Sequence, residues 1–548
     1  MYVQWKYFRK APEEADSRPV VEEASRTAAR RSLALEGKAL ESEPAVSRSA
    51  APTVIKPSLS RRTDGAIVWE AEWANRITGS YECLPAADTG GGFALWSRQG
   101  SGRSLQMHYH RPRRHEGDLG TAEYHFSLAA PGDYRLYMRI RASDHCGNSC
   151  WIGIDRRRGL HCFPDGFDSD FNAQRLHWPE KMFKRWLWLE DTGRLFKLDA
   201  GEHFLRVEVR EDGMAIDQVA LVPDGGDEPS GVVKPTMVPR GTDDLASVRL
   251  AVDHHCLART GEATVHGHLW LRSNSATGLP LVVRLAAGDA KIGPASEICC
   301  ELGPDAPFAY LPVSVTLGDP ARLRAVEFTA AMSMPRHGNA KISVARQRVE
   351  RPFEWRVLGP LGKEADSLAG RELMSAASID FGKPRVLGKE KLEWTLVESP
   401  EHFGHLGAID FTKVFGAREE CVVYAATMVD VAKAGVYRVT AAGDDTMELQ
   451  LDGKSIVHRR AERTVTDTLR PLEVKLAEGR HLLVARVEQR SGEWEMVVRI
   501  DNPDGSAADG VIGVGVTSPA PSISVSPSMP ASPCCATSCG WRGSVPPS

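Results

Sequence analysis

The sequence has no long apolar run and no excess of positive charge. No apolar stretch approaches the roughly 20 residues that a membrane helix needs, so no membrane span is expected. The 68 Lys and Arg residues stand against 72 Asp and Glu residues, and this balance argues against the basic surface of a nucleic-acid binder. Residues 1–10 lack an apolar stretch followed by a small-residue cleavage site, so no signal peptide is visible there.

Common catalytic motifs are also missing. The chain contains no Gly-x-Ser-x-Gly elbow, no His-Glu-x-x-His zinc helix and no Walker phosphate loop. No segment between its seams is long enough for a barrel of roughly 250 residues. A pair of glycosidase carboxylates is not excluded among 72 acidic residues, so an enzyme stays an alternative hypothesis.

The eleven Cys residues do not form the dense pattern of a small disulfide-bonded protein, because they are spread over 548 residues. One group is an alternative zinc site, made of Cys146, Cys150 and Cys162 with His145 and His161. Its spacing differs from the paired cysteines of structural zinc sites. A loop with free or paired thiols is the favoured interpretation.

Strict alternation of apolar and polar residues dominates the middle of the chain. In residues 121–128 the apolar side chains Ala122, Tyr124, Phe126 and Leu128 alternate with polar ones. Such a period of two is typical of half-buried antiparallel strands. The same alternation recurs at 134–141, 205–210, 281–285, 323–328, 447–451 and 496–500. With no long amphipathic helix in 66–503, the sequence predicts an all-β protein built of serial, jelly-roll-like β-sandwiches.

Pro- and Gly-rich seams divide this pattern into modules. The seams near 223–231 and 351–360 give a first module at 66–224, a second at 233–350 and a third at 351–504. Residues 1–65 are rich in Ala, Ser, Glu and Arg, and residues 505–548 in Ser, Pro and Ala. We expect both ends to be disordered.

Two modules share a short pattern, Leu-x-x-Gly-x-His-x-Leu, at 198–205 and again at 476–483. In each copy a Gly precedes an alternating strand. Because glycine is the residue that tight turns need, convergent hairpin chemistry is the favoured interpretation.

Three carboxylates of the first module are candidate metal ligands. Glu70 and Glu72 are two residues apart in a predicted strand at 67–72, so their side chains share one face. Asp217 opens the predicted last strand, and the ends of a domain tend to approach each other. Three converging carboxylates repel unless a cation joins them, and calcium accepts six to eight oxygen ligands. The alternative is a pair of glutamates on a solvent-facing strand.

The first module resembles the family 6 and family 35 carbohydrate-binding modules over about residues 66–224. The resemblance rests on ordered short segments: WEAE at 69–72, GDYR at 132–135, NSCWIGID at 148–155, and the stretch from 201 to 217. It implies a polysaccharide or glycan partner and a structural calcium ion bound by Glu70, Glu72 and Asp217. It also implies an extracellular or periplasmic location.

Sugar sites need aromatic rings for pyranose faces and polar side chains for hydroxyl groups. The predicted insert at 163–186 is long and aromatic, and Trp178 and Trp186 are its candidate sugar-binding residues. Asp144 and Asn148 match positions at which the resembled modules often present polar groups.

The other modules give weaker signals. The second is interpreted as an immunoglobulin-like spacer. The third resembles the protective-antigen-like β-sandwiches, and in some of those an Asp-Asp pair binds calcium and sugar. Asp444 and Asp445 match that pair only as a dipeptide, and a polar turn before a hairpin is the favoured interpretation.

The sequence therefore predicts a non-catalytic, carbohydrate-binding, multi-module protein. A polysaccharide hydrolase or lyase with its active site at a domain junction is one alternative. A structural cell-envelope protein is the other.

Overall fold

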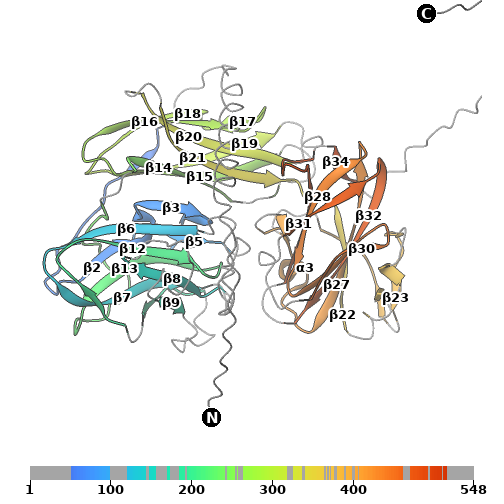
Figure 1. The fold of residues 1–548 in the computed structure, drawn as a ribbon, viewed down its shortest axis with the longest axis horizontal. Coiled ribbons are helices and arrows are strands. Elements are labelled where there is room, and N and C mark those ends of the chain that lie inside the picture. The colour runs from blue at the N-terminus through green and yellow to red at the C-terminus, as the bar shows by residue number, and fades with distance from the viewer. Residues whose placement is uncertain are drawn as a thin grey trace, which may run out of the picture.

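The fold is known from a computed structural model of the chain. The residues that it describes are 51–98, 120–142, 147–155, 169–172, 184–191, 194–240, 244–253, 256, 263–317, 325–335, 340–362, 366, 369–370, 372–374, 379–387, 390–397, 402–404, 407–460, 470–490, 494–508 and 510–514. They form three antiparallel β-sandwiches (Figure 1), which confirms the predicted all-β, serial-sandwich class.

The first sandwich packs a seven-stranded sheet on a five-stranded one. The larger sheet contains, in spatial order, β10 (Leu187–Glu190), β7 (Gly132–Arg141), β13 (Ala215–Pro223), β5 (Phe93–Ser97) and β4 (Tyr81–Pro85), with β11 (Phe196–Leu198) beside β7 and β2 (Ile67–Glu70) beside β13. The smaller sheet contains β3 (Arg76–Gly79), β6 (Gly120–Leu128), β12 (Gly201–Val209), β8 (Ser149–Ile154) and β9 (Ser169–Asn172).

The core of this sandwich follows from the alternation in the sequence. Tyr124 and Phe126 of β6 point inward, and the ring of Trp69 lies 5.7 Å from each. The predicted strand at 67–72 is shorter than expected, because β2 ends at Glu70 and Ala71–Trp73 form a 3₁₀ turn. The hydroxyl of Tyr124 donates to the carbonyl of Ala71 at 2.7 Å, which holds this turn against the core.

The second sandwich has two smaller sheets. One contains β1 (Thr53–Ile55), β19 (Phe308–Leu317), β15 (Ala263–Ser273) and β14 (Ala246–Val252), with β17 (Lys291–Gly293) beside β19. The other contains β18 (Glu297–Leu302), β16 (Leu279–Ala286), β20 (Ala325–Met334) and β21 (Ala340–Glu350).

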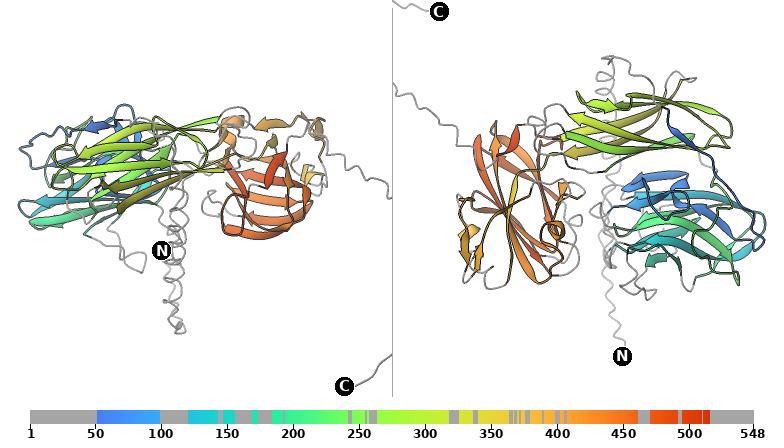
Figure 2. Two further views of the ribbon diagram at one scale, coloured as in Figure 1. Left: turned by 90° about the horizontal axis from the view of Figure 1, so that it is seen from above. Right: turned by 180° about the vertical axis from the view of Figure 1, so that it is seen from behind.

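The third sandwich lies beside the other two (Figure 2). Its seven-stranded sheet contains β25 (Thr395–Val397), β22 (Trp355–Leu361), β27 (Cys421–Val431), β32 (Gly479–Gln489), β29 (Thr446–Leu451) and β30 (Lys454–Arg460), with β34 (Val511–Val514) beside β27. The facing sheet contains β26 (Ile409–Asp410), β33 (Glu495–Asp501), β28 (Gly435–Gly443) and β31 (Arg470–Leu476). A hairpin of β23 (Arg385–Leu387) and β24 (Glu390–Leu392) and the short helix α3 (Phe411–Phe415) complete the module. No helix among the described residues is long and apolar enough to cross a membrane.

Both expected disordered ends contain ordered strands where the structure describes them. Residues 51–65, expected within the disordered segment 1–65, include β1, which adds to the edge of β19 in the second sandwich. Residues 505–514, expected within the disordered tail 505–548, include β34, which pairs with β27. These corrections have one cause: an open sheet edge offers backbone partners that local composition does not reveal.

The first two sandwiches share a packed junction. The ring of Trp73 stacks on Phe308 at 5.5 Å, and Phe93 meets Trp270 at 4.9 Å. Arg272 is buried there and donates to the carbonyl of Trp73. Burial lowers the pKa of Arg272 to about 9. The described residues at this junction therefore pack against one another as in a protein core. The alternative hypothesis of a hydrolase or lyase expects a cleft at this place.

The repeated Leu-x-x-Gly-x-His-x-Leu pattern forms the same His–Asp bridge twice. In the first sandwich, His203 contacts the carboxylate of Asp155 through Nδ1 at 2.7 Å and the carbonyl of Asp199 through Nε2 at 2.8 Å. In the third, His481 contacts Asp452 at 2.6 Å and the carbonyl of Ala477 at 2.9 Å. The shared pattern thus specifies a side-chain bridge as well as a glycine turn.

Each bridge favours a charged imidazolium. Both ring nitrogens face oxygen acceptors, so both need a proton to form hydrogen bonds. Burial opposes the charge, but the bonds to Asp155 and Asp199 outweigh it and raise the pKa of His203. Burial also opposes the charge of His481, and Asp452 with Ala477 raises the pKa of that ring.

We predict a pH-dependent contribution of these bridges to stability. A raised folded-state pKa means that the contribution is complete below the unfolded pKa of about 6.5 and is lost as the pH rises through the folded value. Because the partner carboxylates are partly exposed, the loss should stay below about 1 kcal/mol for each bridge. Denaturant unfolding of wild type and of His203→Asn/His481→Asn between pH 5.5 and 8.5 measures it. The double variant should lose the slope, whereas His266→Asn, on an exposed strand position, should keep it; parallel wild-type and double-variant profiles would contradict the assignment.

Candidate functional site

The three predicted carboxylates come together around β13, an interior strand of the larger sheet of the first sandwich. Pairing of β2 with β13 places Glu70 opposite Gln218, and Gln218 Nε2 donates to Glu70 Oε1 at 3.1 Å. A bulge between Ile216 and Gln218 lets Asp217 contact Arg139 of β7. Glu70 and Glu72 are each 1% exposed and Asp217 is fully buried. The sequence prediction placed these three side chains together, and the structure does so.

The loop of residues 86–92 covers these carboxylates with its backbone. Gly90 N donates to Asp217 Oδ1 at 2.9 Å, and Arg139 donates both to Asp217 and, at 2.9 Å, to the carbonyl of Asp88. A Cβ atom on Gly90 would lie 2.5 Å from Glu70 Oε1, and one on Gly91 would overlap the carboxylate of Glu72. The glycines are therefore needed for the close approach of the backbone.

Burial makes the charged forms of these three carboxylates unfavourable. Burial and the nearby Asp217 raise the pKa of Glu70 to about 8. Burial and then Glu70 raise the pKa of Glu72 well above its usual value. Burial also raises the pKa of Asp217, although Gly90 and Arg139 oppose this. Glu70 Oε2 and both oxygens of Glu72 are buried without a hydrogen-bond partner, which is the environment that a bound cation would relieve.

The donor set is chemically suited to calcium, since all three side chains supply hard oxygen ligands. The arrangement is not a finished metal site. No group of three or more His, Cys, Asp or Glu side chains in the described part of the chain is disposed to hold an ion. Asp217 is already bonded to Gly90 and Arg139, so the open oxygens are those of Glu70 and Glu72. Calcium binding here stays a prediction.

A row of aromatic and cationic side chains lies beside the cluster. Ala215 of β13 pairs with both Trp96 of β5 and Arg141 of β7. Trp186 directly precedes β10, whose first residue pairs with Ile140. The Arg141 guanidinium lies 5.1 Å from the Trp96 ring and 5.4 Å from the Trp186 ring. Two partly exposed indoles thus flank one cation across four strands.

The 86–92 loop connects this row to the carboxylates. Trp186 Nε1 donates to the carbonyl of Ala87 at 3.2 Å, and the Arg139 guanidinium lies 5.6 Å from the Trp186 ring. Arg139 is also the residue that binds Asp217. Displacement of the loop would therefore disturb the carboxylate cluster and the position of Trp186 together.

The other predicted sugar-binding residues do not join this row. Asn148 is 1% exposed, and its backbone N–H donates to Glu211 Oε2 at 3.3 Å. Asp144 and Trp178 lie outside the described residues. Of the alternative zinc group, only Cys150 is described, as a buried free thiol, while Cys146, Cys162, His145 and His161 lie outside the described residues.

Sequence reasoning missed the residues that connect the site. Gly90 and Gly91 belong to a run of three glycines. Such a run indicates a backbone segment that lies close to other groups, because glycine has no side chain. Arg139 and Arg141 alternate with apolar residues and read as ordinary solvent-facing positions. Trp96 gives no local signal, because its role depends on the pairing of β5 with β13.

Asp444 and Asp445 occupy the turn between β28 and β29, as the favoured interpretation expected. They are 6% and 9% exposed, and Asp445 Oδ2 accepts from Arg490 N at 2.6 Å. The following hairpin closes at Asp452 and Gly453, which both have positive φ, of 49° and 74°. The dipeptide therefore has a clear structural role in forming this turn.

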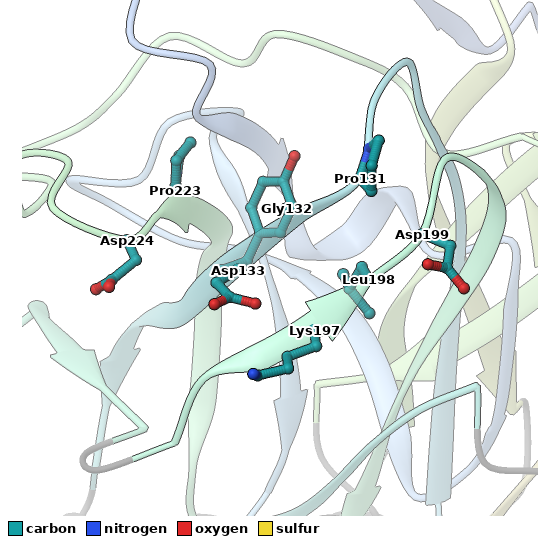
Figure 3. A pocket seen from close by; sticks show the side chains of 9 residues that line it. Pro131, Gly132, Asp133, Lys197, Leu198, Asp199, Pro223 and Asp224 are labelled. Atoms are coloured by element: carbon teal, nitrogen blue, oxygen red, sulfur yellow. The ribbon is translucent and has the colours of Figure 1, made fainter.

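An open depression lies at the opposite end of β7 from the carboxylate cluster (Figure 3). It has a volume of about 680 Å³ and is surrounded by the side chains of Asp133, Asp199, Asp224 and Lys197. Asp224 is held by Arg135 at 2.9 Å. Acidic groups dominate this surface, and it shares no residue with the tryptophan row.

No family model matches the chain, and no curated protein matches it. Solved structures with local similarity include the Podospora anserina GH26-CBM35 β-(1,4)-mannanase, at 17% identity and a TM-score of 0.19, covering 30% of this chain and 29% of the mannanase. Another is the C-terminal CBM6 of LamC, a marine laminarinase from Zobellia galactanivorans, at 11% identity and a TM-score of 0.20, covering 29% of this chain and 98% of that module. The Amycolatopsis orientalis exo-chitosanase CsxA matches at 10% identity and a TM-score of 0.19 over 57% of this chain and 35% of the enzyme. The chain thus spans about a third of the two enzymes, and these TM-scores support no argument about its function.

Proposed function

We propose that this chain is a non-catalytic carbohydrate-binding protein whose first sandwich binds a polysaccharide or glycan on the Trp96–Arg141–Trp186 row. The observation that supports this most directly is the bonding of loop 86–92 to both Trp186 and Asp217. In the proposal, a calcium ion held by Glu70, Glu72 and Asp217 fixes the loop, and the loop fixes the tryptophan.

The side chains of the row divide the recognition between them. The indole faces of Trp96 and Trp186 cover the apolar faces of pyranose rings, and the guanidinium of Arg141 donates hydrogen bonds to hydroxyl groups. Bound calcium supplies positive charge, which offsets the repulsion among three buried carboxylates. The Arg139 guanidinium also neutralises part of the negative charge of the carboxylates, because it forms an ion pair with Asp217.

Burial of the carboxylates favours binding over catalysis. A glycosidase places two carboxyl groups on either side of the bond that it cleaves. Glu70, Glu72 and Asp217 are at most 1% exposed, and the 86–92 backbone lies over them. They are out of reach of a substrate in this conformation, so a structural role fits them better than an acid–base role.

We predict that calcium stabilises the first sandwich. Calcium at about 100 times its Kd should add about 2.7 kcal/mol, which raises the Tm of a sandwich of this size by roughly 5–10 °C. Thermal unfolding of the full chain, with calcium and with a chelator, measures the shift. Glu72→Gln should abolish it by removing a buried ligand, whereas Glu202→Gln, an exposed change on β12, should not. Equal shifts in both variants would contradict this calcium site.

We predict that Trp186→Ala weakens glycan binding roughly 10- to 30-fold, as expected for a tryptophan that contacts the ligand. A glycan array probed with the full chain identifies the ligand, and titration of that ligand measures the change. Leu195→Ala, an exposed apolar residue of the same sandwich, is the matched control and should bind normally. A chelator should weaken wild-type binding, because the loop that holds Trp186 loses its anchor.

Unchanged binding by Trp186→Ala would reject the proposed row. Turnover of the bound polysaccharide by the wild-type chain would instead support the alternative of a hydrolase or lyase.

A further inference from the structure

A second cavity lies in the third sandwich, on the face of its seven-stranded sheet turned away from the core. Its volume is about 550 Å³, within the usual range for small-molecule sites. An apolar layer covers part of this face, and its described residues include Leu373, Phe381 and Trp394. Asp366, Gly370 and Met374 line the cavity next to this layer.

The strand register explains the polar floor of the cavity. Arg486 of β32 pairs with Tyr424 of β27 on one side and with Glu448 of β29 on the other. Glu448 in turn pairs with His458 of β30. Side chains directly opposite one another share a face of the sheet, so these four residues form one row across four strands.

The inner end of the row is fixed and neutralised. Arg486 forms a two-bond ion pair with Asp366, at 2.8 and 2.6 Å, and the Tyr424 hydroxyl donates to the same carboxylate at 2.7 Å. Burial alone would raise the pKa of Asp366, but Arg486 and then Tyr424 outweigh it and hold that pKa below its usual value. The Arg486–Asp366 ion pair therefore forms one side of the cavity and carries no net charge.

The outer end presents groups of mixed character. Glu448 and Glu488 provide carboxylate acceptors, and Arg490 and His458 provide donors. His458 Nδ1 lies 3.7 Å from Glu448 Oε2, and Arg490 Nε lies 3.7 Å from Glu488 Oε1. Both distances exceed a hydrogen bond. Glu448 Oε1 accepts from Gln450 Nε2 at 3.2 Å, and Glu488 Oε2 accepts from Arg486 Nη1 at 3.4 Å. The other oxygen of each carboxylate, Glu448 Oε2 and Glu488 Oε1, is therefore the acceptor left for a ligand.

One buried hydroxyl has no partner. Thr446 lines the cavity and is 7% exposed, and its Oγ1 is buried without a hydrogen bond. A buried polar atom in this state is unfavourable unless a ligand or water meets it. This second observation is independent of the charged row, and it also points to an occupant that forms hydrogen bonds.

We infer that this cavity binds a neutral, polyhydroxylated ligand, such as a single hexose unit of a glycan. Glu448 and Glu488 would repel an anion, and Arg490 would repel a cation. A hexose offers several hydroxyl groups that both donate and accept, which matches alternating carboxylate, guanidinium, imidazole and hydroxyl groups. The site is separate from the tryptophan row, so it does not depend on the function proposed for the first sandwich.

Saturation-transfer NMR of the full chain tests this inference. The protein carries Trp186→Ala, so that binding to the first sandwich contributes little. The probes are methyl α-mannopyranoside, methyl β-galactopyranoside and methyl β-glucopyranoside, with methyl β-glucuronide as an anionic comparison. At least one neutral glycoside should bind, and it should bind more tightly than the glucuronide.

Two substitutions locate the binding. Thr446→Val keeps the shape of the side chain and removes its hydroxyl. Glu448→Gln removes charge from a partly exposed side chain, and circular dichroism should show that the variant keeps its fold. Each should weaken binding roughly 5- to 10-fold. Glu473→Gln, an exposed change on β31 in the opposite sheet, is the control and should have no effect. Three results overturn the inference: no neutral glycoside binds, only the glucuronide binds, or both cavity variants bind like the control.

Discussion

The surface of the first sandwich depends on the bonds that Asp217 receives from Arg139 and Gly90. A buried carboxylate next to Glu70 and Glu72 would be strongly unfavourable without a compensating donor. Arg139 provides this compensation and also holds the loop through Asp88. The same loop accepts a hydrogen bond from Trp186 through the carbonyl of Ala87, so these contacts connect the buried carboxylates to the tryptophan.

The outer faces of the larger sheets are covered in a similar way in the first and third sandwiches. In each, a short segment packs an apolar layer on part of that face: around Val233 in the first sandwich, and around Phe381 and Trp394 in the third. Charged side chains begin where the apolar layer ends, and an Arg–Asp pair stands at each border, Arg139 with Asp217 and Arg486 with Asp366. Each border therefore places an Arg–Asp ion pair beside other charged side chains of the same sheet.

The alternation of apolar and polar residues predicted the strands well, because a strand with one buried face shows this pattern within a few consecutive residues. The approach of Glu70 to Asp217 was also predictable, since it needed only the pairing of the first and last strands. The bulge at Asp217, the partners of Trp96 and the edge pairing of β1 were not predictable, because each depends on strand register set by distant residues. Asn148 illustrates the same limit: a loop position in the sequence is an interior position in the structure.

The strand Thr53–Ile55 precedes the first sandwich in the chain but belongs to the sheet of the second. The polypeptide thus ties the two sandwiches together at both ends of the first, once through this strand and once through the connection after Pro223. A fragment begun at residue 66 would leave the Phe308–Tyr310 edge of β19 without its partner, and bare edges of this kind promote self-association. A fragment that contains the second sandwich therefore has to include the residues from 51 onward. The first and second sandwiches thus form one unit that is best expressed together.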